Sequence, residues 1–87
     1  MIEIENTSQQ LPLPLDQLPP GAFAKVHSVE AKGEIRQRLL EMGFIRGTRI
    51  RVERLAPMGD PMELVIRGTH LSLRKEESAC ILVVPEA

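Results

Sequence analysis

The fold class is decided by the stretch MELVIRGTHLSLR, residues 62–74. Apolar and polar residues alternate on both sides of its Gly68-Thr69 pair. A period of two is typical of a strand with one face in a core, and a glycine-containing pair suits a tight connection. The stretch therefore predicts two strands, over 62–67 and 70–74, joined by a short hairpin.

Further strands are predicted on both sides of this hairpin. Residues 48–55 alternate in the same way, and residues 80–84 are a short apolar run ended by a proline. Residues 22–30 read as a strand that begins after a Pro-Gly turn. Between the last two strands, residues 75–79 are expected to form a turn or a single helical turn. The chain thus carries five short predicted strands.

One helix is predicted, from about residue 34 to residue 42. Ile35, Leu39 and Met42 are spaced at i, i+4 and i+7, which places them on one apolar face. Gly43 follows as a left-handed stop, so that Phe44 can pack back on the helix end.

Five short strands and one helix fit a small barrel. An open sheet of this size leaves strand edges that must be paired or covered, and a partly closed five-stranded barrel with an aliphatic interior does both. We therefore predict a mainly β, SH3-like barrel whose helix caps one open end. An open α+β sheet with the helix on one face is the alternative.

The Pro-rich segment LPLPLDQLPPG, residues 11–21, precedes the first predicted strand. Its prolines exclude a long helix and any central strand. We expect its leucines to hold this segment against the core. The predicted domain covers residues 13–85, and residues 1–12 are expected to form a flexible tail.

Composition limits the function classes. The chain has 87 residues, of which 43% are hydrophobic, and a single cysteine, Cys80, excludes an intrachain disulfide framework and a Cys-based zinc finger. The longest apolar run, 79–84, is far shorter than the roughly 20 residues that a membrane-spanning helix needs. The acidic start MIEIE lacks the order of a secretory signal. We expect a cytoplasmic protein without membrane insertion.

Charge is distributed unevenly along the chain, whose formal net charge is −1. Residues 34–75 carry nine Lys and Arg against five acids, and the remainder carries two Lys against seven acids. A mildly basic middle suits docking to an acidic protein surface. Ordinary scatter of surface charge explains the asymmetry equally well.

Neither catalysis nor a designed metal site is indicated. The chain lacks the G-x-x-x-x-G-K-[ST] loop that cradles phosphates, and it has no Ser-His-Asp or Cys-His arrangement at an identifiable spacing. We predict that it is not an enzyme and has no catalytic residue. His27 and His70 lie on different predicted strands, without a carboxylate at short spacing. We therefore assign no cofactor and no metal-binding residue.

Three stretches, in order, resemble a known family. RLLEMGFIRGT (38–48) is similar to the R-L-x-x-[LM]-G-[FIM]-x-x-G stretch of FeoA proteins, and APMGDP (56–61) resembles their A-P-x-G-D-P loop. Arg67-Gly68 with LSLRKEE (71–77) resembles their closing strand pair. The resemblance extends from about Leu13 to Val84.

This resemblance implies an SH3-like barrel and a small cytosolic accessory protein of ferrous iron uptake, a part of transition-metal homeostasis. The implied partner is FeoB, a bacterial membrane transporter with a cytoplasmic GTP-binding domain. A similar domain stands at the C-terminus of DtxR-type metal-dependent repressors. A metal-responsive regulatory domain and a small nucleic-acid-binding barrel are the alternative functions. Whether the protein activates, assembles or restrains FeoB stays open.

The predicted partner-binding surface is the helix end with the turn after it, because this region carries more apolar side chains than one short helix needs for packing. Leu40 lies about 100° away from the apolar helix face, so contact with a partner and packing against residues 11–18 are equally supported. We assign six residues to this surface: Leu39, Leu40, Met42, Phe44, Ile45 and Arg46.

Loop 56–61 is a second candidate contact, through Met58 and Asp60, although its Gly-Asp-Pro letters are mainly those of a structural turn. Self-association through an exposed strand edge is also open.

Arginines allow two other roles. A nucleic acid would need stacking aromatics in a basic groove, and the chain offers only Phe23 and Phe44, so no nucleic-acid partner is expected. The candidates for phosphate contact are Arg46, Arg49, Arg51 and Arg54. An arginine finger acting in trans on the GTPase of FeoB would be Arg46, Arg49 or Arg74, and no sequence feature selects one of them.

Overall fold

Buried and exposed side chains alternate along the strands, as the sequence pattern predicts. In β4 (Met62–Ile66), Met62, Leu64 and Ile66 are buried, while Glu63 and Val65 between them are partly exposed. Burying one face of each strand removes apolar area from water and sets which residues of neighbouring strands lie opposite each other.

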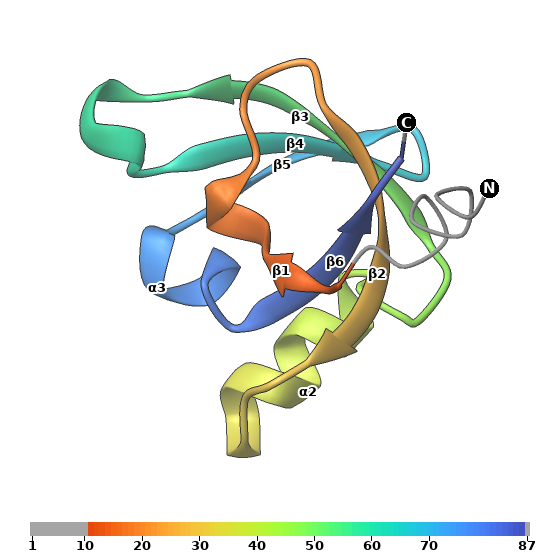
Figure 1. Ribbon diagram of the computed structural model, residues 1–87. Helices are drawn as coiled ribbons and strands as arrows, with labels where there is room; N and C mark the ends of the chain where they lie inside the picture. The colour runs from red at the N-terminus through yellow and green to blue at the C-terminus, as the bar shows by residue number, and fades with distance from the viewer. Residues whose placement is uncertain (1–10, 87) are drawn as a thin grey trace, which may run out of the picture.

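The computed structural model describes residues 11–86 (Figure 1). Within them, the strands form one antiparallel sheet in the order β1-β6-β2-β3-β4-β5. The elements in chain order are β1 (Leu13–Pro14), η1 (Leu15–Gln17), β2 (Phe23–Val29), α2 (Gly33–Glu41), β3 (Arg49–Leu55), η2 (Pro57–Gly59), β4, β5 (Thr69–Leu73), α3 (Lys75–Ser78) and β6 (Ile81–Pro85).

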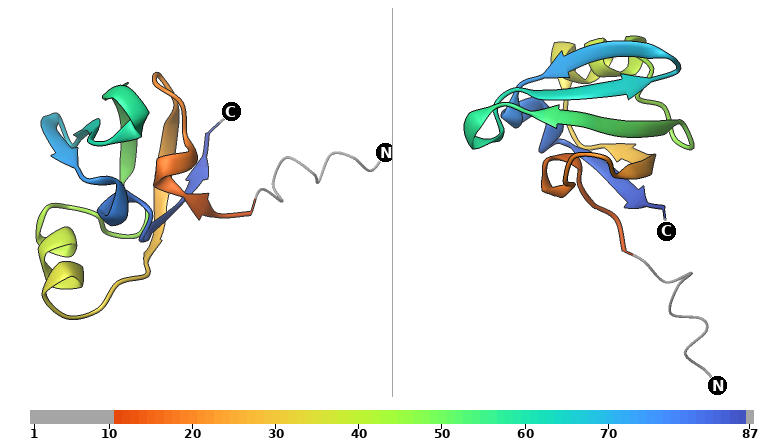
Figure 2. Two further views of the ribbon diagram at one scale, coloured as in Figure 1. Left: turned by 90° about the vertical axis from the view of Figure 1, so that its left-hand side faces the viewer. Right: turned by 90° about the horizontal axis from the view of Figure 1, so that it is seen from above.

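The sheet curls around the core instead of forming a flat layer (Figure 1). Irregularities in the pairing of β2 with β6 and of β3 with β4 support this curvature, since a bulge bends its strand and increases the local twist. Figure 2 shows α2 at one end of this barrel, away from β1. The predicted mainly β barrel is therefore confirmed, and the open sheet with a helix across one face is not the observed arrangement.

The Pro-rich segment forms a short strand that the sequence analysis did not predict. β1 pairs through Leu13 and Pro14 with β6, at one edge of the sheet. Proline is tolerated there because an edge strand does not need every N–H for pairing. Leu15 and Leu18 are buried in the core, which confirms that the leucines hold this segment in place. Of the predicted tail over 1–12, residues 1–10 lie outside the described part of the chain.

The helix is less buried than its sequence pattern predicts. Of the predicted apolar face, Leu39 is fully buried and Met42 is half-buried, but Ile35 keeps 47% of its surface exposed. The reason is geometric: residues 33–38 are all exposed, and the helix meets the barrel with its C-terminal turn. The first turn of α2 therefore extends past the barrel into solvent.

Candidate functional site

Burial divides the six residues predicted to bind a partner into two groups. Leu39 and Phe44 are fully buried core residues. Assigning them to a partner surface is therefore wrong, because neither side chain is accessible. Leu40 and Met42 are half-buried, Ile45 is 48% exposed, and Arg46 is exposed. We define the α2-end surface as Leu40, Met42, Ile45 and Arg46.

The backbone after α2 explains this division. Gly43 has a φ of 110°, in the region that favours glycine, and it turns the chain as the predicted left-handed stop. The N–H of Phe44 then donates to the carbonyl of Leu39 over 3.1 Å, which closes the helix end. Phe44 packs inward from this position, and Ile45 follows on the outside.

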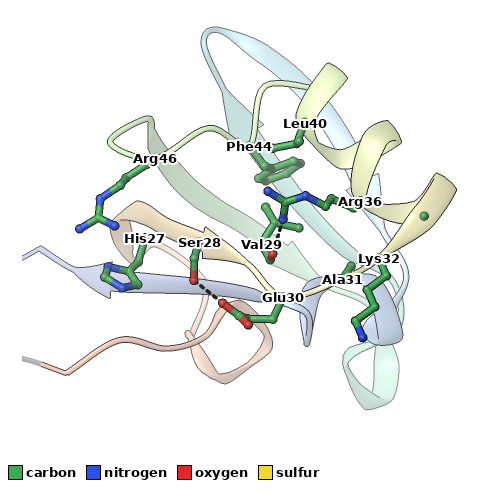
Figure 3. A pocket seen from close by; sticks show the side chains of 11 residues that line it. His27, Ser28, Val29, Glu30, Ala31, Lys32, Arg36, Leu40, Phe44 and Arg46 are labelled. Carbon is green, nitrogen blue, oxygen red and sulfur yellow. Dashed lines mark hydrogen bonds between the residues drawn. The ribbon is translucent and has the colours of Figure 1, made fainter.

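A groove lies between the end of β2 and α2, next to the α2-end surface (Figure 3). We call it the β2–α2 groove. It has a volume of ≈ 720 Å³ and is lined by residues 27–33 and by Arg36, Leu40, Phe44 and Arg46. β2 runs past the start of β3: Lys25 pairs with Arg49, the first residue of β3, and Val26 still exchanges hydrogen bonds with Gly47 and Thr48. Beyond Val26, Ser28 and Val29 pair with β6, and the groove lies along this end of β2.

Cationic side chains are spread along this groove. Figure 3 shows Arg46 beside His27 at one end, Lys32 toward the other end, and Arg36 between them. The Nη1 group of Arg36 donates to the carbonyl oxygen of Val29 over 2.8 Å, so the guanidinium is anchored on the strand.

The groove also holds one carboxylate, that of Glu30. It accepts a hydrogen bond from the hydroxyl of Ser28 over 2.9 Å. The groove thus carries a surplus of positive charge on a chain whose net charge is −1.

Sequence reasoning found Leu40 and Arg46 but missed the groove itself. The sequence analysis assigns no role to Arg36 or Lys32. Their spacing of four residues is no signal for a shared surface, because Lys32 precedes α2 with extended backbone and helical spacing does not apply to it. Their common groove depends on how far β2 runs past the start of β3.

Loop 56–61 lies outside the groove. Met58 is 94% exposed and has a φ of 66°. An oxygen of Asp60 accepts a hydrogen bond from the backbone N–H of Lys75 over 3.2 Å, which ties the loop to the start of α3. This bond supports the structural role of the loop, and its predicted partner contact stays untested.

Carboxylates engage three of the four arginines considered for phosphate contact. Arg49 pairs with Glu86 over 2.9 Å, Arg51 with Glu53 over 2.7 Å, and Arg54 with Glu63 over 3.0 Å. The Cζ of Arg49 also lies 4.2 Å from the ring centroid of Phe23. Among residues 11–86, Arg46 has no such carboxylate partner. Geometry therefore distinguishes Arg46, which sequence alone did not.

Potential metal ligands are scattered. His27 is on β2, His70 is on β5, and Cys80 precedes β6, where its thiol donates to the carbonyl of Glu76 over 3.2 Å. No group of three or more His, Cys, Asp or Glu side chains gathers within the described residues. In the same part of the chain, no helix is long and apolar enough to cross a membrane.

Comparison with known proteins decides the family. The model of the FeoA domain matches residues 13–85. The chain belongs to the FeoA family. This is a family of small accessory domains linked to ferrous iron transport.

Two FeoA structures share the fold of this FeoA protein. A solution structure of FeoA from Chlorobium tepidum is 39% identical, with a TM-score of 0.80 over 86% of this chain and 71% of that one. A crystal structure of FeoA from Stenotrophomonas maltophilia, an SH3 domain protein complexed with zinc, is 31% identical, with a TM-score of 0.72 over 84% of this chain and 88% of that one.

A relative of known sequence is much longer. The chain is 42% identical over 69 residues to the Fe(2+) transport protein A/Fe(2+) transporter FeoB fusion protein of Porphyromonas gingivalis. The match covers 79% of this chain but 8% of the fusion protein. In that relative, a FeoA segment and the FeoB transporter thus belong to one polypeptide.

Proposed function

We propose that this chain is a non-catalytic interaction module of bacterial ferrous iron uptake that docks on the cytoplasmic side of the FeoB transporter. The observation that carries the proposal is the relative in which a FeoA segment and FeoB form a fusion protein. A covalent link keeps two domains at a high effective concentration relative to each other, which favours their association if they act in contact. A separate FeoA chain needs a docking surface instead.

The α2-end surface has the composition of such a contact. Leu40 and Ile45 offer apolar area that the core does not cover, and Arg46 stands at its rim. Interfaces combine an apolar centre with a polar edge and are enriched in arginine. This surface is therefore our proposed contact with FeoB.

The surroundings of the side chains that could act as nucleophiles support a non-catalytic module. Ser78 is buried, and its hydroxyl donates to the carbonyl of Lys75 over 3.0 Å. Cys80 is engaged with a carbonyl as well, and the two histidines are on separate strands. A nucleophile needs a base within hydrogen-bond reach, and the hydrogen-bond partners of Ser78 and Cys80 are backbone carbonyls, which cannot act as that base.

The alternative functions have weaker support. A nucleic-acid site would use the arginines of β3, and these already pair with carboxylates. A metal-responsive domain would need gathered ligands, which residues 11–86 do not supply.

The test is binding to full-length FeoB of the same organism in nanodiscs of neutral phosphatidylcholine. Binding of the labelled chain is measured with GDP and with a non-hydrolysable GTP analogue. We expect saturable binding in at least one nucleotide state. Absence of binding in both states overturns the proposal.

A matched pair of variants tests the surface. Ile45→Glu places a charge on the α2-end surface, while Ile35→Glu does so on the other exposed isoleucine of the same region. We expect Ile45→Glu to weaken binding at least tenfold, because a buried charge in an interface is costly, and Ile35→Glu to leave it unchanged. Equal affinities of both variants and the wild type would place the contact elsewhere.

A further inference from the structure

We propose that the β2–α2 groove is the recognition site for an acidic, extended segment of the partner protein. The inference rests on the proposed function, in which that partner is FeoB. It adds the chemistry of the segment that is bound and the residues that select it.

Charge is the first argument. Lys32, Arg36 and Arg46 line the groove against the single carboxylate of Glu30. A surface with a surplus of one sign attracts a partner of the opposite sign and excludes one of the same sign. The complementary ligand is therefore rich in Asp and Glu.

The state of Arg36 is the second argument. Its guanidinium is anchored on the Val29 carbonyl over 2.8 Å, so the side chain is held in place before a partner binds. A guanidinium has five N–H donors, and donors not used on Val29 are left to bind a carboxylate. Fixing a side chain in advance lowers the entropy cost of binding.

The floor of the groove favours a peptide over a nucleic acid. Leu40 is half-buried there, and Phe44 beneath it is fully buried, so its ring offers no face for a base to stack on. Nucleotide sites of small barrels rely on exposed aromatic rings. A peptide with an apolar side chain between two acidic residues would complement this groove, in which Leu40 lies between the cationic side chains.

The shape of the groove indicates an extended ligand. Its cations are placed along the run from His27 to Lys32, with Arg46 near the start of this run and Lys32 at its end (Figure 3). An extended chain rises about 3.3 Å per residue, so about five or six residues would follow this run. The predicted ligand is a short acidic segment with an apolar residue near its centre.

The first measurement is the affinity for FeoB in phosphatidylcholine nanodiscs at increasing salt, for the wild type and for Arg46→Glu and Lys32→Glu. Both side chains are exposed, so these variants are expected to fold. We expect each variant to weaken binding by roughly tenfold, because the new Glu side chain would repel the carboxylates of the acidic segment. Each variant should also flatten the salt dependence of binding.

The control is Arg54→Glu, which makes the same change of charge outside the groove, on β3. We expect this variant to bind FeoB like the wild type. Its changed charge acts on the bound segment only over a long distance, and salt screens such interactions. Losses of equal size in all three variants would reduce the effect to net charge and overturn the groove as a specific site.

The outcomes separate this inference from the proposed function. If the wild type does not bind FeoB at all, the proposed function fails. If the wild type binds and Lys32→Glu, which alters the groove but not the α2-end surface, binds equally well, the groove inference fails and the proposed function stands. Two further probes name the competing ligands: vesicles with phosphatidylglycerol and a 12-nucleotide single-stranded RNA. Tight binding of either one, lost in Arg46→Glu and Lys32→Glu, would assign the groove to lipid or RNA and overturn the inference.

Discussion

The strands of the barrel and the segment from Gly33 to Gly47 use their apolar residues differently. β4 buries every second residue, whereas α2 buries Leu39 alone among its nine residues. Ile35 and Ile45 in the second region stay about half exposed. The difference shows which part of a small domain is available for binding, since the barrel needs its apolar residues for its own core.

Backbone hydrogen bonding explains why the two regions differ. A strand satisfies its N–H and C=O groups on neighbouring strands and so must be packed among them. A helix satisfies these groups internally and needs few points of attachment. For α2 these include Leu39, Phe44 just after it, the Arg36 bond to Val29, and an ion pair of Arg38 with Glu77. The comparison leads to four predictions, ordered by the size of their effect.

Phe44→Ala removes the largest buried side chain next to the helix. We expect it to lower the free energy of unfolding by about 3–5 kcal/mol, because it leaves a cavity where α2 meets the barrel. Urea denaturation followed by circular dichroism measures the loss. A loss below about 1 kcal/mol would mean that the helix end does not depend on this contact.

Leu64→Ala and Leu39→Ala compare the two regions directly, since both leucines are fully buried. Each should cost about 2–5 kcal/mol by the same cavity argument. Hydrogen exchange should then differ: Leu64→Ala lowers protection throughout the sheet, and Leu39→Ala lowers it most strongly in residues 33–41. Uniform loss of protection in both variants would show that the helix and the barrel open together.

Gly43→Ala tests the turn that sends Phe44 inward. The added methyl would meet the side chains of Ile66 and Arg67 at ordinary distances, 3.5 and 3.6 Å, so space does not forbid it. The backbone disfavours the substitution, because residues other than glycine rarely adopt a φ of 110°. We expect a loss of about 1–3 kcal/mol in a thermal or urea denaturation. Gly47→Ala, also at a positive φ, shows whether the effect belongs to this turn.

Ile35→Gln and Ile45→Gln should have the smallest effects on stability. Both side chains are about half exposed, so each change should alter the free energy of unfolding by less than about 0.5 kcal/mol. Denaturation of the two variants in parallel measures this. A loss above about 1 kcal/mol at Ile45 would mean that it supports the fold and is not free for a partner.

Much of the fold was predictable because it depends on local pattern. The strands around Gly68 follow from a period of two, and Gly43 follows from the need for a left-handed residue at a helix end. The FeoA family also follows from short motifs at fixed spacing, since a family model matches residues 13–85.

The candidate site was predictable only in part. Leu40, Ile45 and Arg46 remain at least partly accessible, whereas Leu39 and Phe44 are core residues. An apolar residue near a helix end reads the same in sequence whether it faces the barrel or solvent. The angle at which α2 meets the barrel decides between the two, and local spacing does not contain that angle.

By itself, then, the sequence determined the five strands β2 to β6, the helix α2, its stop and the family, because these depend on residues close together in the chain. The tertiary structure decided how far β2 runs past the start of β3, which arginines meet carboxylates, and that Lys32, Arg36 and Arg46 share one groove. These features depend on contacts between distant residues. Their geometry is set only when the barrel closes and the helix docks on its end.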